Sequence, residues 1–363
     1  MVERRILVTG AGGMGGVNFV RALRLAESQV GERYFIVGTE FNPYHIEFPE
    51  SDVAIRTPRH SDPGFVDALL GIIGEHGIEF LHPHPSSEAR VVAENRGRFD
   101  DAGARTLLPE AGEIMPDKLH IYNRLRERGV AVPGTFHVGS TEDIRGAFRE
   151  LGSPLWIRHV SGAGGRLGLR VDSAEEAELW VRLNVVQGRA REGDFILQEY
   201  LPGRDLAFDS LWFEGELATS YARERLEYPF RHISLSGITG TPSVARTIVD
   251  GAVNGVGISA VRALSGRPHG FYSVDMKEDA GGRPVVTEVD GKWHTTAPLW
   301  GHAFARALGD PEYNLAHLYI RLGYGEGIPD VPRTDLFPED YYMIRQMDSG
   351  VILRGRGGKW RIA

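Results

Sequence analysis

Residues 284–293 read PVVTEVDGKW. The first four residues suit a β-strand, and Glu288, Asp290 and Lys292 then follow at alternating positions. Because alternate residues of a strand point to the same side, two carboxylates and one ammonium are predicted to share one face of a sheet. A charged row of this kind in an apolar strand predicts a ligand or a metal ion opposite that face.

A third acid accompanies this row. Asp275 ends the predicted strand FYSVD, and a hairpin through the intervening KEDAGGR would place Asp275 beside Glu288. Carboxylates on adjacent strands repel one another unless a cation neutralises them, and oxygen ligands suit Mg²⁺, which usually takes one or two carboxylates plus substrate phosphates. Asp275, Glu288 and Asp290 are therefore candidate metal ligands, and a solvated acidic face is the alternative.

Composition sets outer limits on the function. The chain has 363 residues, of which 42% are hydrophobic and 25% charged, and this allows two or three domains with sizeable cores. The formal charge of −8 argues against a broad nucleic-acid surface. The absence of cysteine excludes disulfides, zinc–thiolate sites and cysteine nucleophiles. Without a long apolar segment or a signal-peptide core, we expect a cytoplasmic protein that binds neither membrane nor nucleic acid.

A glycine loop near the N-terminus allows two interpretations. Gly10–Gly15 matches GxGxxG between a predicted strand and a predicted helix, and Glu40 ends the next strand. This is the dinucleotide fingerprint in its usual context, which indicates an NAD(P)-dependent oxidoreductase. Alternatively, the glycines only shape a tight turn. Strands alternate with helices up to about residue 115, which predicts a parallel α/β unit.

A second glycine loop follows a strand that ends near Arg158. It contains Ser161, Gly162, Gly164 and Gly165, and its backbone N–H groups and nearby guanidinium groups are suited to phosphates. A plain hairpin turn is the alternative. The longer strands after residue 116 predict an α+β region with antiparallel pairing. A phosphate-binding loop and a Mg²⁺ site in one region imply nucleoside triphosphate chemistry.

Four segments together resemble the ATP-grasp superfamily, most closely its carbamoyl-phosphate-synthase-like carboxylate–amine ligases. They are PDKLHIYNRL (116–125), PLWIRHVSGAGGRLGL (154–169), FILQEYLPGRDLAFD (195–209) and YSVDMKEDAGGRPVVTEVDGK (272–292). The resemblance covers most of the chain. It implies a Rossmann-like pre-ATP-grasp domain (1–115), a linker helix with a lid subdomain (116–195), a C-terminal subdomain with hinge and metal site (196–325), and a tail (326–363).

The resemblance also implies roles for individual residues. Lys118, Arg158 and the second glycine loop would contact phosphates, and Lys292 and Arg246 would steady an acyl phosphate. The adenine hinge would be formed by Glu199, Tyr200 and Leu201, the ribose would be bound by Asp205, and Mg²⁺ by Asp275, Glu288 and Asp290. Asp290 replaces the usual Asn of the family, and Lys292 replaces the usual Arg, so the planar fork of a guanidinium is lost.

The implied function is ATP-dependent ligation of a small carboxylate to a small amine through an acyl phosphate, with ATP and Mg²⁺ as cofactors. Similar proteins are frequently homodimers. An NAD(P)-dependent oxidoreductase remains an alternative, as does a kinase-like or otherwise non-ligase ATP-binding protein.

Three further sequence features give weaker indications of function. His82 and His84 look like metal ligands but lack recognisable partners, so structural or substrate-contacting roles are favoured. His294 follows the metal strand and either contacts the acceptor or is a plain hydrogen-bonded histidine. The segment 221–234 is either a site of acceptor recognition or an irregular surface excursion.

Overall fold

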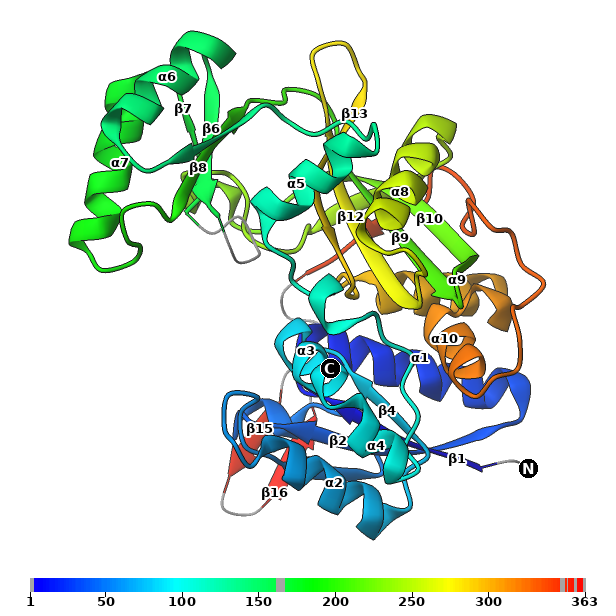
Figure 1. Cartoon of the computed structure of the whole chain (residues 1–363). Helices are drawn as coiled ribbons and strands as arrows, with labels where there is room; N and C mark the ends of the chain where they lie inside the picture. Colours follow the sequence, from blue (N-terminus) through cyan, green and yellow to red (C-terminus); the bar gives the residue numbers. More distant parts are fainter. Residues whose placement is uncertain (1–2, 161–166, 347–349, 351, 356–357, 362–363) are drawn as a thin grey trace.

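The computed structural model describes residues 3–160, 167–346, 350, 352–355 and 358–361 (Figure 1). Its N-terminal part is a parallel sheet of order β3-β2-β1-β4, as the alternating pattern predicts. The elements of this part are β1 (Glu3–Thr9), α1 (Met14–Val30), β2 (Arg33–Glu40), η1 (His45–Glu47), β3 (Val53–Arg56), α2 (Phe65–His76), β4 (Phe80–Pro83), α3 (Ser86–Glu94), α4 (Arg96–Asp101) and η2 (Ala111–Glu113).

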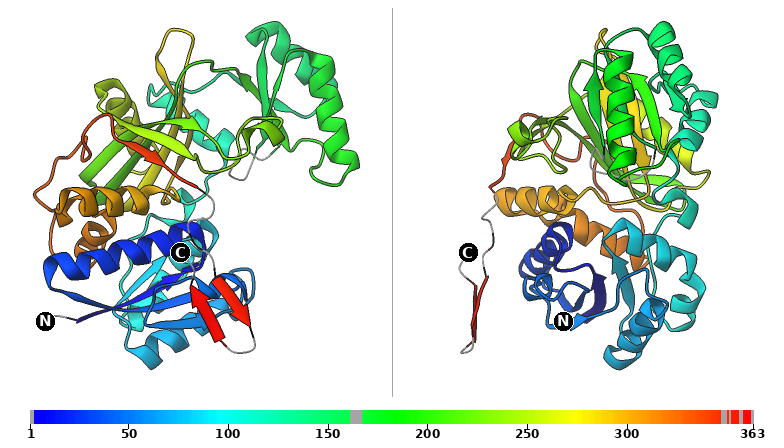
Figure 2. Two further views of the ribbon diagram at one scale, coloured as in Figure 1. Left: turned by 180° about the vertical axis from the view of Figure 1, so that it is seen from behind. Right: turned by 90° about the vertical axis from the view of Figure 1, so that its left-hand side faces the viewer.

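A second, smaller sheet stands apart from the rest of the molecule (Figure 2). Its strands are antiparallel in the order β5-β8-β6-β7, and α6 and α7 pack together beside them. Both helices begin at a serine whose hydroxyl accepts a backbone N–H. The elements are β5 (Thr135–Val138), α6 (Thr141–Leu151), β6 (Leu155–His159), β7 (Leu169–Val171), α7 (Ala174–Val186) and β8 (Phe195–Glu199). The preceding helix α5 (Lys118–Glu127) packs instead against α8 of the large sheet.

The largest sheet is antiparallel, with the order β13-β12-β9-β10-β11-β14. The predicted hairpin is present: β12 pairs with β13, and Asp275 lies directly opposite Glu288. Helix α8 packs against the apolar face of this sheet, which includes the buried side chains of Phe208 and Trp212. The elements are β9 (Asp205–Phe213), β10 (Glu216–Glu227), η3 (Arg231–Ile233), β11 (Val244–Ile248), α8 (Gly251–Leu264), β12 (Gly270–Glu278), β13 (Pro284–Asp290) and β14 (Tyr342–Ile344).

Two later helices connect the large sheet to the N-terminal part. They are α9 (Ala297–Leu308) and α10 (Leu315–Gly323), separated by η4 (Pro311–Tyr313), and both pack against α1. Phe19 and Phe304 belong to the same apolar core, so the first and last thirds of the chain share one hydrophobic cluster. A final hairpin of β15 (Ile352–Gly355) and β16 (Gly358–Arg361) contacts the N-terminal part through the pair Lys359–Glu47. Across the described ranges, no helix has the length and apolar character needed to cross a bilayer.

Candidate active site

A cavity of about 1310 Å³ lies between the small sheet and the large sheet. Ligand pockets typically measure roughly 300–1,000 Å³, so this cavity has room for more than one small molecule. Its walls come from β6, β8, β9, β10, β12 and β13, from the loop 228–242, and from the segment 292–296 that follows the acidic strand.

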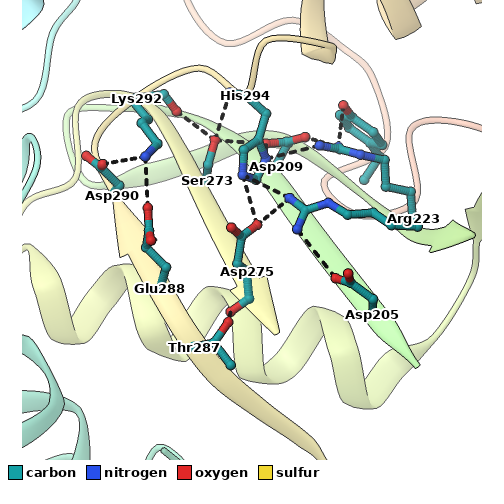
Figure 3. Close-up of polar contacts among 12 residues, drawn as sticks. Asp205, Asp209, Arg223, Ser273, Asp275, Thr287, Glu288, Asp290, Lys292 and His294 are labelled. Atoms are coloured by element: carbon teal, nitrogen blue, oxygen red, sulfur yellow. Dashed lines mark hydrogen bonds and ion pairs between the residues drawn. The ribbon is translucent and has the colours of Figure 1, made fainter. Parts of the chain in front are cut away.

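Lys292 joins the two acids that precede it (Figure 3). Its Nζ lies 2.9 Å from Glu288 Oε1 and 2.8 Å from Asp290 Oδ2, so the three side chains meet as their alternation predicts. Burial raises the pKa of Glu288, but Lys292 and Lys118 outweigh it and bring that pKa to about 2. Glu288 is therefore a permanent anion at neutral pH.

Asp290 is buried and does not line the cavity. One of its oxygens, Oδ1, accepts the backbone N–H of Met115 at 2.8 Å, and the other contacts Lys292. Asp275 and Glu288 do line the cavity. No group of three or more potential metal ligands is assembled within the described part of the chain, so the predicted trio is not preformed. Two carboxylates are nevertheless the number that Mg²⁺ takes when phosphate oxygens supply other ligands, and Asp275 and Glu288 fit that type of site.

Asp275 belongs to a network of charged side chains that also includes His294 and Asp209. His294 Nε2 lies 2.9 Å from Asp275 Oδ1, and His294 Nδ1 lies 2.7 Å from Asp209 Oδ1. Burial lowers the pKa of His294, but the two carboxylates outweigh it and raise the pKa above its ordinary value. The imidazole therefore bridges two acids, and both of them favour its protonated form (Figure 3).

Two arginines complete this network. Arg223 pairs with Asp209, and both side chains are almost fully buried. Arg225 contacts Asp275 at 2.5 Å and Asp205 at 3.5 Å. Sequence reasoning missed both arginines. The signal was present in the alternating charges of the strand segment ARERLE, which put the two guanidinium groups on one side of β10.

The predicted hinge residues also line the cavity. Glu199 ends β8, and Tyr200 and Leu201 follow it directly. Asp205 lies at the start of β9, where its Oδ2 accepts the hydroxyl of Tyr228 at 2.8 Å. The cavity therefore brings together the residues expected at the adenine and ribose and the residues expected at the metal.

Two of the predicted phosphate-binding residues, Lys118 and Arg158, lie next to Glu288. Lys118 is buried, and its Nζ lies 3.5 Å from Glu288 Oε2; Arg158 approaches the same oxygen at 3.5 Å and lines the cavity. Ser161, Gly162, Gly164 and Gly165 lie outside the described residues.

Arg246 is placed away from this group of cations. Its guanidinium pairs with Glu224 and Asp340, and the residue is absent from the cavity wall. The geometry therefore does not support the role predicted for Arg246.

The N-terminal glycine loop is filled by protein atoms. A Cβ at Gly12 would lie 2.2 Å from the carbonyl oxygen of His45, and one at Gly15 would lie 1.9 Å from His84 Nε2. A dinucleotide site needs the second glycine of the fingerprint so that a pyrophosphate can approach the backbone. Here the space beside that glycine is occupied by the chain itself, so the loop gives no support to the oxidoreductase alternative.

His82 and His84 lie in an aromatic core. The His82 ring stacks on Phe19 with ring centroids 3.8 Å apart, and its Nε2 lies 3.1 Å from His84 Nδ1. Burial lowers the pKa of both histidines, that of His84 to about 4. With no third potential ligand among the described residues, this packing favours the structural interpretation.

The chain is similar in sequence to known ligases. No family model matches the chain. A glutamate–LysW ligase from Sulfurisphaera tokodaii is 26% identical over 196 residues, which are 53% of this chain and 66% of that protein. A glutamate–LysW ligase from Sulfolobus acidocaldarius is 22% identical over 220 residues, 60% of this chain and 73% of that protein. The match thus spans slightly less than two thirds of the length of the first of these relatives.

Solved structures share the fold at lower identity. An L-amino acid ligase from Bacillus licheniformis matches with a TM-score of 0.61 and 15% identity, over 89% of this chain and 74% of that one. A biotin carboxylase from Campylobacter jejuni matches with a TM-score of 0.66 and 14% identity, over 90% and 72%. An N5-carboxyaminoimidazole synthetase from Staphylococcus aureus matches with a TM-score of 0.61 and 12% identity, over 92% and 81%. The predicted resemblance is confirmed at the level of similarity: the chain is similar in sequence to glutamate–LysW ligases and shares its fold with an L-amino acid ligase and a biotin carboxylase.

Proposed function

We propose that the chain is an ATP-dependent carboxylate–amine ligase. One observation carries the proposal: Asp275 and Glu288 face the same cavity as the hinge residues, and cationic side chains gather around Glu288. Two acids beside several cations suit a triphosphate with its metal ion better than they suit a nicotinamide. The relatives named above are ligases, which supports the same assignment.

The proposed reaction has two steps. A carboxylate oxygen attacks the γ-phosphorus of ATP, the bond from that phosphorus to the bridging oxygen breaks, and ADP leaves. The amine nitrogen then attacks the carbonyl carbon of the acyl phosphate, the carbon–oxygen bond to phosphate breaks, and the nitrogen loses a proton. An amide and inorganic phosphate result.

The protein contributes mainly position and charge. Arg158 and Lys118 would neutralise phosphate oxygens, and Lys292 would stabilise charge on the acyl-phosphate oxygens, because phosphoryl transfer depends on positioning and electrostatics more than on covalent catalysis. Asp275 and Glu288 would hold Mg²⁺, which polarises the phosphates when bound. Ser161 and the glycines of its loop keep their predicted role of covering the phosphates.

The domain division is part of the proposal. We assign residues 1–115 to a Rossmann-like unit, 116–195 to the lid, 196–325 to the subdomain with hinge and metal site, and 326–363 to a tail. The substrates are proposed to be a small carboxylate and a small amine. The relatives are described by their names as acting on glutamate and on L-amino acids, so amino acids are the first compounds to test.

The test is an ADP-release screen with Mg²⁺-ATP and pairs of candidate carboxylates and amines. The proposal expects ADP release that requires both members of a pair, together with an amide product found by mass spectrometry. Steady ADP release with a carboxylate but no amine would instead favour a kinase-like enzyme. A rise in melting temperature with NAD(P) and none with Mg²⁺-ATP would refute the proposal in favour of the oxidoreductase.

A further inference from the structure

The cavity is positively charged in an acidic protein. Seven Lys or Arg side chains and four Asp or Glu side chains line it, although the chain has a formal charge of −8. Most of these cations already face an acid, as Arg225 faces Asp275 and Lys292 faces Glu288. Arg231 and Lys277 are different, because no acidic group within the described ranges lies at ion-pair distance from either of them. Lys277 lies near the hinge, with its Nζ 5.7 Å from the Tyr200 ring, whereas Arg231 lines the cavity from η3.

Arg345 is a further cation without an acid, at the rim of the same cavity. Its Nη1 donates to the carbonyl oxygen of Pro242 at 3.1 Å, and Pro242 lines the cavity. Its Nη2 lies 3.9 Å from Met14 Sδ, and its backbone N–H donates to Ser243 at 2.8 Å. The side chain is partly buried, burial lowers its pKa, and none of the described carboxylates lies at ion-pair distance from it.

A partly desolvated guanidinium without a counter-ion is unfavourable until an anion reaches it. The surroundings of Arg345 increase this tendency. Met14 begins α1, whose N-terminus has no side-chain cap, and Ser86 begins α3 and lines the cavity. The first backbone N–H groups of a helix carry partial positive charge, so three positive features border this end of the cavity.

We propose that Arg231 and Arg345 bind an oxyanion, carboxylate or phosphate, carried by a substrate other than ATP. The inference rests on the proposed function. It narrows the substrates to molecules that carry a negatively charged group in addition to the carboxylate or amine that reacts. The triphosphate has its own cations in Arg158 and Lys118, so it leaves Arg231 and Arg345 without a role. A charge-assisted hydrogen bond from a guanidinium to an oxyanion supplies both affinity and selectivity.

Titration calorimetry on the full chain, saturated with Mg²⁺-ADP, tests the inference directly. The probes are L-glutamate and glutarate for carboxylates, O-phosphoethanolamine for phosphates, and glutaramide as a neutral match. We expect at least one charged probe to bind, and we expect Arg231→Gln and Arg345→Gln each to weaken it about tenfold or more. The charged probe that binds identifies the oxyanion as carboxylate or phosphate.

Arg182→Gln is the matched control, because Arg182 is exposed on α7 and absent from the cavity wall. It should leave probe binding unchanged, and thermal unfolding of all three variants should match the parent. Failure of every charged probe to bind the parent, or equal binding by the parent and both cavity variants, would overturn the inference. ADP release measured on the same preparations separates the two proposals. If charged probes bind in an Arg-dependent way but no ligase turnover is found, the ligase proposal is refuted and the anion-site proposal is supported.

Discussion

Glu88 provides a quantitative test of the structure. It lies in the first turn of α3 with 5% of its surface exposed, and its Oε2 has no hydrogen-bond partner in the described part of the chain. Burial raises the pKa of Glu88, the nearby hydroxyl of Thr9 opposes this, and the charge of Glu40 adds to the rise, so that the pKa reaches about 7. An ordinary glutamate would have a pKa of 4.5.

The direction of the pH effect follows from this pKa. Between about pH 4.5 and about pH 7 the folded protein holds a proton on Glu88 that the unfolded chain has already released. The free energy of unfolding is therefore highest, as far as this group is concerned, below about pH 4.5, and it declines as the pH rises to about 7. A shift of this size corresponds to about 3 kcal/mol at about 1.4 kcal/mol per pKa unit.

The perturbation is Glu88→Gln, which keeps the shape of the side chain and removes the titration. Denaturant unfolding measures the free energy of unfolding of the variant minus that of the parent at each pH. This difference should be about 3 kcal/mol larger at about pH 8.5 than at about pH 4.5. Glu94→Gln, at an exposed position of the same helix, should show no such change. A difference between parent and Glu88→Gln that does not vary with pH would refute the reasoning.

Three further changes test the site. Glu288→Gln should lower ADP release by about 100-fold or more, because a ligand of the proposed metal site is lost, while the protein still folds; near-normal turnover would remove Glu288 from the site. Asp209→Asn should lower the free energy of unfolding by about 3–5 kcal/mol, since Arg223 is then left buried without its counter-ion, and denaturant titration would contradict this if the midpoint did not move. Arg246→Gln should leave ADP release within about twofold of the parent, because its ion pairs lie partly exposed outside the cavity, and a large loss of turnover would restore its predicted role.

The sequence was most informative where local patterns decide the geometry. Alternation in 284–290 and the short loop before it were sufficient to predict that Asp275 lies opposite Glu288. The strand, glycine turn and helix at residues 3–30 were equally predictable, since apolar runs and glycines mark them.

The remaining features depend on contacts between distant residues. Asp290 is turned by the backbone N–H of Met115, which lies far away in the sequence, so no local pattern could give its direction. Arg223 and Arg225 become part of the site only because the register of β9 and β10 places them beside the acids of β9. The space beside Gly12 is taken by His45, and a motif alone cannot show that a loop is already covered.

The salt bridges around Glu288 and Asp275 also set an order of events. Each acid is neutralised by basic side chains before any nucleotide arrives, so a lone dication would have to displace an ammonium or a guanidinium to gain entry. The phosphate oxygens of a nucleoside triphosphate would pair with those same basic groups. The two carboxylates would then be available to the metal ion bound to the nucleotide. Metal and nucleotide are thus expected to enter as a pair, and chelators should leave the resting protein unharmed.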